Sequence, residues 1–102
     1  MNIEKTKHIN NLLDIYGELL TDYQKEIMNL YYQEDLSLKE IAEEKEVSRN
    51  AIFTLITRVE KILLDYEEKL HLLDKRNRVQ NVLDNNEISN DIKKSIEDIL
   101  DE

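Results

Sequence analysis

Residues 37–62, SLKEIAEEKEVSRNAIFTLITRVEKI, decide the expected fold, because they contain the starts of two helices separated by a tight turn. Ser37 and Glu40 have the spacing of a capping box, in which the side chain of each residue accepts a hydrogen bond from the free backbone N–H of the other. Ser48 is a favourable N-cap for the second helix. The pattern predicts a helix-turn-helix over residues 37–62.

The apolar side chains of this stretch support the same arrangement. They fall where the two helices must touch, and a small one falls where the helix axes approach closely. These inward positions are Ile41, Ala42, Val47, Ile52 and Leu55. The turn breaks one local rule, because Glu46 stands where glycine commonly supplies a left-handed backbone, at a cost of about 1 kcal/mol.

With these side chains turned inward, the second helix presents a separate outward face. Its candidates for contacting a nucleic acid are Arg49, Asn50, Phe53, Thr54, Thr57, Arg58 and Lys61. We expect Arg49 and Asn50, at the start of the helix, to approach base edges or phosphates. Arg58 and Lys61 would contact the phosphate backbone.

The composition predicts an all-α protein. The chain of 102 residues has no proline, one glycine, 36% charged residues and 40% hydrophobic residues, which favours long helices over the turns that sheets require. This length predicts a single domain over residues 1–102. Since cysteine is absent, disulfides and thiolate metal sites are excluded.

The chain shows no signal for a membrane. No apolar run approaches the roughly 18 residues of a membrane span, and the first residues, MNIEKTKHIN, lack the apolar centre of a signal peptide. We therefore expect a cytoplasmic protein without membrane insertion.

Helical periodicity and caps predict the remaining elements. Helices are expected over about residues 3–19, 22–32 and 38–45, then as one long helix over about 49–83, and finally as a C-terminal helix over about 90–100. Thr21 and Gln24 have the spacing of another capping box, which opens the helix over residues 22–32. In that helix, Ile27, Leu30 and Tyr31 are expected to face inward. The long helix meets no breaker until Asp84, and Ser89 is positioned to cap the C-terminal helix.

The long helix carries a heptad stripe, in which apolar residues alternate at spacings of four and three. The stripe runs through Ile52, Ile56, Val59, Leu63, Tyr66, Leu70 and Leu73, and Asn77 takes the next position. We favour a homodimer with Leu63, Tyr66, Leu70, Leu73 and Asn77 in its interface, because so long a helix should project beyond a small core. The alternative is a monomer whose N-terminal helices fold back and cover the whole stripe.

The net charge of −9 argues against a general affinity for polyanions. Its distribution weakens that objection. Basic and acidic residues are equal in number between residues 37 and 62, so the whole net charge lies in the rest of the chain. Binding of nucleic acid through this neutral element would be weak and sensitive to salt.

The sequence lacks the signs of a catalytic site, so we expect a protein that is not an enzyme and uses no cofactor or metal. His8 and His71 are far apart and lack companion ligands at metal-binding spacing. Neighbouring carboxylates such as Glu43 and Glu44 point about 100° apart on a helix and cannot share one substrate. No glycine-rich phosphate loop is present.

Residues 19–63 resemble the promoter-reading C-terminal region of bacterial sigma factors. Together with residues 64–75, LDYEEKLHLLDK, they resemble more closely the YlxM family of small helix-turn-helix proteins. The most specific stretches are LYYQEDLSLKEIAEE, VSRNAIF and DYEEKL. The resemblance implies an all-helical, dimeric bacterial protein, encoded beside the GTPase of the signal recognition particle. A role in that pathway, with this GTPase as a partner, is implied by the same neighbourhood.

Two hypotheses about function follow. The first is a regulator that binds DNA or a structured RNA through the outward face of the second motif helix. The second is a protein-binding adaptor of the signal recognition particle machinery that uses the same surface, with Phe53 as its anchor. Phe53 discriminates between them, because a large exposed aromatic suits a protein interface, although it can also touch a thymine methyl group or stack on an unpaired base. The structural alternative for Phe53 is partial burial against the first helix or a dimer partner, without a role in binding.

Overall fold

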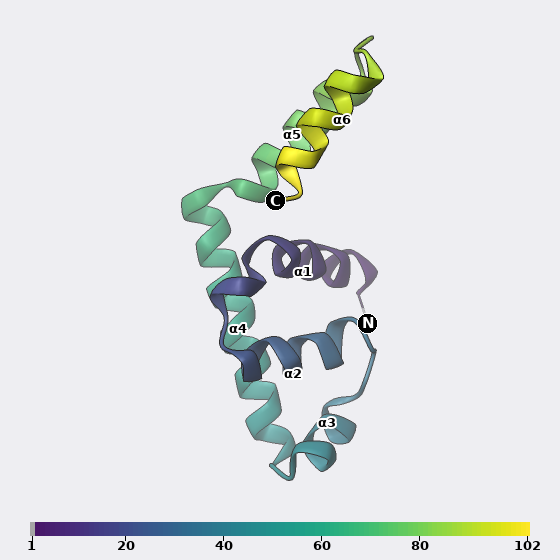
Figure 1. Cartoon of the computed structure of the whole chain (residues 1–102). Coiled ribbons are helices and arrows are strands. Elements are labelled where there is room, and N and C mark those ends of the chain that lie inside the picture. Colours follow the sequence, from purple (N-terminus) through teal and green to yellow (C-terminus); the bar gives the residue numbers. More distant parts are fainter. Residues whose placement is uncertain (1) are drawn as a thin grey trace. The chain divides into compact units, whose positions relative to one another are not determined.

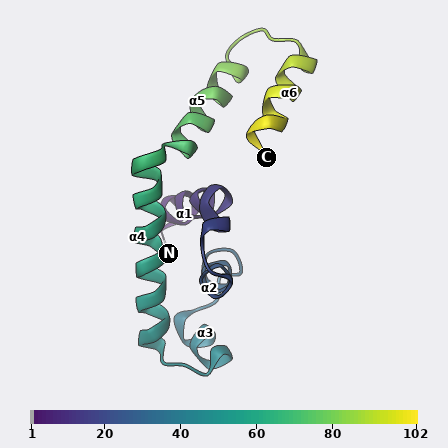
Figure 2. The ribbon, with the colours of Figure 1, turned by 60° about the vertical axis from the view of Figure 1, so that its left-hand side comes forward.

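The computed structural model describes residues 2–102, and over that range its regular elements are all helical (Figures 1 and 2). The elements are α1 (Ile3–Tyr16), the 3-10 helix η1 (Gly17–Leu19), α2 (Asp22–Tyr32), α3 (Leu38–Lys45), α4 (Arg49–Leu70), α5 (Leu72–Asp84) and α6 (Asn90–Leu100). The predicted all-α class is confirmed. The chain divides after Leu70 into two compact units, where the sequence had suggested one domain.

Capping boxes begin α2 and α3 as the sequence predicts. Gln24 Oε1 accepts from the Thr21 N–H at 3.0 Å, and Thr21 Oγ1 accepts from the Gln24 N–H at 3.2 Å. Ser37 and Glu40 form the same capping box, with both distances at 3.1 Å. A cap of this kind contributes about 0.5–2 kcal/mol, because it pairs backbone donors that the helix leaves free.

The core of the first unit forms where α4 contacts α1, α2 and α3, which lie along one side of it (Figures 1 and 2). The inner stripe of α4, Ile52, Ile56, Val59 and Leu63, is almost completely buried. Opposite it lie Ile9, Leu12 and Tyr16 of α1 and Ile27 and Met28 of α2, also buried. Each such side chain stabilises the unit by about 1.5–3 kcal/mol. The stripe as far as Leu63 is therefore covered within the chain.

The buried face of α2 differs from the expected one. Ile27 is fully buried as predicted, but its inward companions are Met28 and Tyr32. Leu30 and Tyr31 are half-buried, and the ring of Tyr31 meets that of Tyr32 edge-on, with 4.9 Å between centroids. A helix in a small unit turns toward the helices around it, so periodicity alone misses its exact rotation.

The predicted single helix over residues 49–83 is wrong at His71. There the backbone turns left-handed, with φ 56° and ψ 27°, so α4 ends at Leu70 and α5 starts at Leu72. No glycine or proline marks the break. Histidine adopts the left-handed conformation more often than most residues other than glycine. The conformation still destabilises the backbone at this residue by about 1–2 kcal/mol.

The second unit is a hairpin of α5 and α6. Leu73 and Leu83 of α5 are buried, whereas α6 has no buried residue. Lys93 of α6 pairs with Asp84 at 3.3 Å, and Gln80 Nε2 donates to Glu97 at 3.1 Å. Ser89 caps α6 as predicted, through the Ile92 N–H at 3.3 Å.

Candidate nucleic-acid interface

The turn between α3 and α4 has the geometry of a helix-turn-helix. Glu46 adopts the predicted left-handed conformation, with φ 56° and ψ 42°. Its N–H donates to the Glu43 carbonyl at 3.3 Å, and the N–H of Val47 donates to the Ala42 carbonyl at 3.0 Å. These two bonds close the end of α3 as in a Schellman motif. Ser48 then begins α4 by accepting from the Ala51 N–H at 3.0 Å.

The expected inward wedge between these two helices is largely present. Ile41, Ala42 and Ile52 are buried, and Leu55 is half-buried. Val47 differs, because 41% of its surface stays exposed beyond the end of α3. The wedge therefore depends mainly on Ile41 of α3 and Ile52 of α4, which are both almost completely buried where these two helices contact each other.

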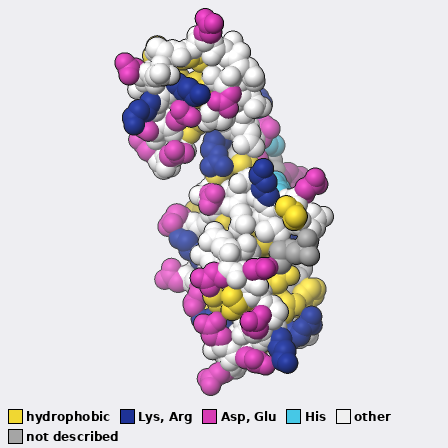
Figure 3. Space-filling model, turned by 90° about the vertical axis from the view of Figure 1, so that its right-hand side faces the viewer, with side chains coloured by type: hydrophobic (Ala, Val, Ile, Leu, Met, Phe, Trp, Pro, Cys, Tyr) yellow, Lys and Arg dark blue, Asp and Glu magenta, His cyan; other side chains and the backbone are white. Residues whose placement is uncertain are grey.

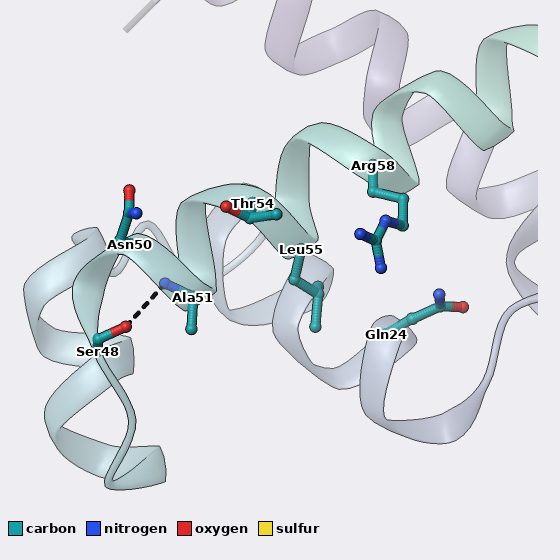
Figure 4. A pocket seen from close by; sticks show the side chains of 7 residues that line it. All are labelled: Gln24, Ser48, Asn50, Ala51, Thr54, Leu55 and Arg58. Carbon is teal, nitrogen blue, oxygen red and sulfur yellow. Dashed lines mark hydrogen bonds between the residues drawn. The ribbon is translucent and has the colours of Figure 1, made fainter.

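All seven residues proposed to contact nucleic acid are exposed on α4. The structure brings three of them, Asn50, Thr54 and Arg58, to one hollow of about 520 Å³ that Gln24 of α2 also lines (Figure 4). Arg49 lines a different hollow, with Lys39 and Glu40 among its neighbours. Phe53, Thr57 and Lys61 line neither of these hollows, and 53% of the Phe53 surface is exposed.

Sequence reasoning did not include Gln24 in the site. The sequence predicts only a capping box for Thr21 and Gln24, and they form it. The residue lies in α2, outside the helix-turn-helix, and reaches the hollow because α2 packs against α4. A glutamine at the third position of a helix has an amide donor besides the oxygen used for capping. That spare donor was the one sign in the sequence that Gln24 could contact a ligand.

The outward face of α4 is more basic than the sequence suggested. The sole carboxylate between Arg49 and Leu64 is Glu60, and it is turned toward the other helices. Glu60 pairs with Lys5 of α1 at 3.2 Å and accepts a hydrogen bond from the Tyr32 hydroxyl of α2. Burial, and next this hydrogen bond, raise the pKa of Tyr32 well above its usual range.

Carboxylates are spread over much of the remaining surface, as one face of the molecule shows (Figure 3). Three other surface hollows each include at least one of them: Asp35 in the first, Asp14 and Glu18 in the second, and Asp35 and Glu40 in the third. The hollow beside α4 contains no carboxylate, and Arg58 is its one charged residue. Among these four hollows, it is thus the one suited to an anionic ligand.

The residues predicted for a dimer seam do not form one open stripe. Leu63 is fully buried in the first unit, and Leu73 is buried as well. Tyr66 is half-buried and stacks on Tyr16 with 5.7 Å between ring centroids. Leu70 is 44% exposed and Asn77 is also exposed. The folded-back arrangement thus covers the stripe at Leu63, and that position is not available to a second chain.

Over residues 2–102, no group of histidine and acidic side chains is arranged to hold a metal ion. His8 and His71 are both exposed; His8 lies on α1 and His71 at the break between α4 and α5. In the same range, the helices are too short or too polar to cross a membrane.

Comparison with known proteins finds one matching family. The family UPF0122, described as "Putative helix-turn-helix protein, YlxM / p13 like", matches residues 3–102. The UPF0122 protein YlxM of Bacillus subtilis strain 168 is 56% identical over 75 residues, covering 74% of this chain and 68% of the relative. A UPF0122 protein of Clostridium perfringens is 46% identical over 108 residues, covering 98% of this chain and 96% of that protein.

The matched stretch is shorter in other relatives. A UPF0122 protein of Lactococcus lactis subsp. cremoris strain MG1363 is 54% identical over 72 residues, which cover 71% of this chain and 65% of that protein. The chain therefore matches slightly less than two thirds of the length of this relative.

Proposed function

Since the chain belongs to the UPF0122 family of YlxM / p13-like proteins, we propose that it is a regulatory protein that binds nucleic acid through the outward face of α4. The ligand is DNA or a structured RNA. In this proposal α4 acts as the recognition helix, and its first residues, Arg49 and Asn50, lie nearest the bases.

One observation carries the proposal. From Arg49 to Lys61, the outward face of α4 combines three cations with no carboxylate, on a protein of net charge −9. Arg49, Arg58 and Lys61 form no ion pair with any described residue. Their charges are free to neutralise phosphates, while the ion pair with Lys5 keeps the Glu60 carboxylate away from that face.

We also propose a pathway and a cellular location for this protein. The resemblance to the YlxM family supports a role in the signal recognition particle pathway, with its RNA and its GTPase as candidate partners. A cytoplasmic location and a function without catalysis belong to the same proposal, and so does a homodimer. Few phosphates are neutralised, so the affinity is expected to be modest at physiological salt.

A second candidate is favoured by Phe53. This aromatic ring is 53% exposed in the middle of the same face, where no described residue covers it fully. Large aromatics often anchor protein interfaces. An adaptor that binds a protein of the signal recognition particle machinery would use Phe53 first and the cations second.

Binding of the purified protein to three probes tests the two functions. The probes are a duplex DNA of mixed sequence, the signal recognition particle RNA and its GTPase, each followed by fluorescence anisotropy. We expect binding to at least one nucleic acid, with log affinity falling against log salt at a slope shallower than about −3, because three cations are available. If neither nucleic acid binds at low salt and the GTPase does, the adaptor function replaces the first.

A further inference from the structure

Two hydrogen-bond donors from different helices face the same hollow. The Arg58 guanidinium extends from α4 toward the Gln24 amide of α2 (Figure 4). Neither group carries a negative charge, and no described residue accepts a hydrogen bond from either.

The direction of the Gln24 amide follows from the capping box. Its Oε1 accepts from the Thr21 N–H at 3.0 Å, so the oxygen must face the start of α2. The two atoms of the amide end point in different directions, and Nε2 is therefore left to face away from the cap. The hydrogen-bond network sets this orientation, since an oxygen is the only end of the amide that can accept from a backbone N–H.

The hollow offers donors but no anionic acceptor. Arg58 is exposed and its cation is unpaired among the described residues. The hydroxyl of Ser48 uses its oxygen to accept from Ala51, which leaves its proton free to donate. Thr54 adds a second exposed hydroxyl. This combination of exposed donors and one cation, with no carboxylate among the lining residues, is complementary to an anionic acceptor.

We propose that Gln24 and Arg58 together hold one phosphodiester group of the nucleic-acid backbone. This inference rests on the proposed function and deepens it, because it brings α2 into the interface. A phosphodiester has two outward oxygens, so it can accept from the guanidinium and from the amide at once, and guanidinium groups bind such oxygens well. A phosphate contact from a second helix fixes how α4 lies in a groove, although it reads no sequence.

Gln24→Glu is the variant that tests the phosphate contact most directly. The new carboxylate keeps an oxygen for the Thr21 N–H, so the capping box and α2 are retained. It removes the amide donor and places a negative charge where a phosphate would bind. Gln33→Glu is the matched control, because it makes the same change on an exposed residue just beyond the other end of α2.

We expect Gln24→Glu to weaken binding of a 20-base-pair DNA duplex or of the signal recognition particle RNA by about tenfold or more. Gln33→Glu should change it by less than about twofold, and thermal melting should show that both variants fold. If both variants weaken binding equally, Gln24 holds no phosphate, although the wild type still binds nucleic acid. If the wild type binds neither probe, the proposed function and this inference fail together.

A titration with inorganic phosphate tests the contact without any nucleic acid. In ¹⁵N-labelled wild-type protein, the side-chain amide of Gln24 and the Nε–H of Arg58 should shift together. The Gln33 amide should not move. If Gln24 and Arg58 stay unshifted while the duplex binds, the proposed contact is wrong. If Gln24→Glu instead weakens only the binding of the GTPase, the acceptor is a protein carboxylate and the phosphate assignment is overturned.

Discussion

Lys5 of α1 and Glu60 of α4 form an ion pair, with 3.2 Å between Nζ and Oε2. The same carboxylate accepts from the Tyr32 hydroxyl, so α1, α2 and α4 meet at Glu60. This junction lies on the inner side of α4 and joins the helices that cover its apolar stripe. Glu60 is the one carboxylate between Arg49 and Leu64, and this pairing holds it away from the face that carries Arg58 and Lys61.

The Tyr32 hydroxyl should make stability depend on alkaline pH. The folded state raises the pKa of Tyr32, so above about pH 10 the unfolded chain loses this proton while the folded chain keeps it. The free energy of unfolding should then fall as pH rises, by at most about 1.4 kcal/mol per pH unit from this residue. Urea unfolding of the wild type between pH 8 and pH 11 measures the slope.

Tyr32→Phe is the control for that slope. This variant should lower the free energy of unfolding by about 0.5–3 kcal/mol at pH 8, because the half-buried Glu60 loses a hydrogen-bond donor. Above pH 10, its free energy of unfolding should fall less steeply with pH than that of the wild type. An unchanged alkaline slope in the variant would assign the effect to other groups.

Glu46→Gly should raise the free energy of unfolding by up to about 1 kcal/mol, because glycine adopts the left-handed conformation of this turn without steric cost. Glu43→Gly, which removes the same charge from within α3, should lower stability by about 0.5–1 kcal/mol. Thermal unfolding compares them. A less stable Glu46→Gly variant would contradict the strain at this turn.

Arg49→Ala and Arg58→Ala should each weaken nucleic-acid binding by about 1–3 kcal/mol and make its salt dependence shallower, because each removes an unpaired cation from the outward face. Lys94→Ala changes the net charge equally on an exposed residue of α6 and should have little effect. Phe53→Ala should weaken nucleic-acid binding less than either arginine variant does. If it instead abolishes binding of a partner protein that the double arginine variant retains, α4 serves as a protein interface.

Self-association through the exposed part of the stripe remains a prediction, and Leu70 is its accessible apolar position. Leu70→Glu should convert dimers to monomers, measured by light scattering. Leu64→Glu is the control, because Leu64 is exposed to a similar extent, 46% against 44%, but lies off the stripe. A wild type that is monomeric at every concentration would end the dimer hypothesis.

Leu63 should behave differently from Leu70, because it is fully buried within the first unit. Leu63→Ala should cost about 2–5 kcal/mol, and Leu63→Glu should unfold the unit by forcing a charge into its core. Urea unfolding measures the first variant and circular dichroism the second. A folded Leu63→Glu variant would contradict the burial of this side chain within the unit. If that variant were monomeric and the wild type dimeric, Leu63 would lie at an interface between chains.

Features that depend on neighbouring residues could be predicted from the sequence. The capping boxes at Thr21 and Ser37, the N-cap at Ser48 and the strained turn at Glu46 each involve atoms only a few residues apart. The inward positions Ile41 and Ile52 followed from helical spacing. Such local interactions are the same in any chain that places these residues in this order, so the all-α class and the helix-turn-helix were determined by the sequence itself.

Tertiary packing decided the remaining features, because they depend on contacts between residues far apart in the chain. The break at His71 carries no glycine or proline signal, so the local sequence does not predict its left-handed backbone. The pairing of Glu60 with Lys5, and the arrival of Gln24 beside Arg58, require α1 and α2 to fold back along α4. Local periodicity showed that α4 had an apolar stripe, but the packing of those helices determined which of its residues stayed exposed.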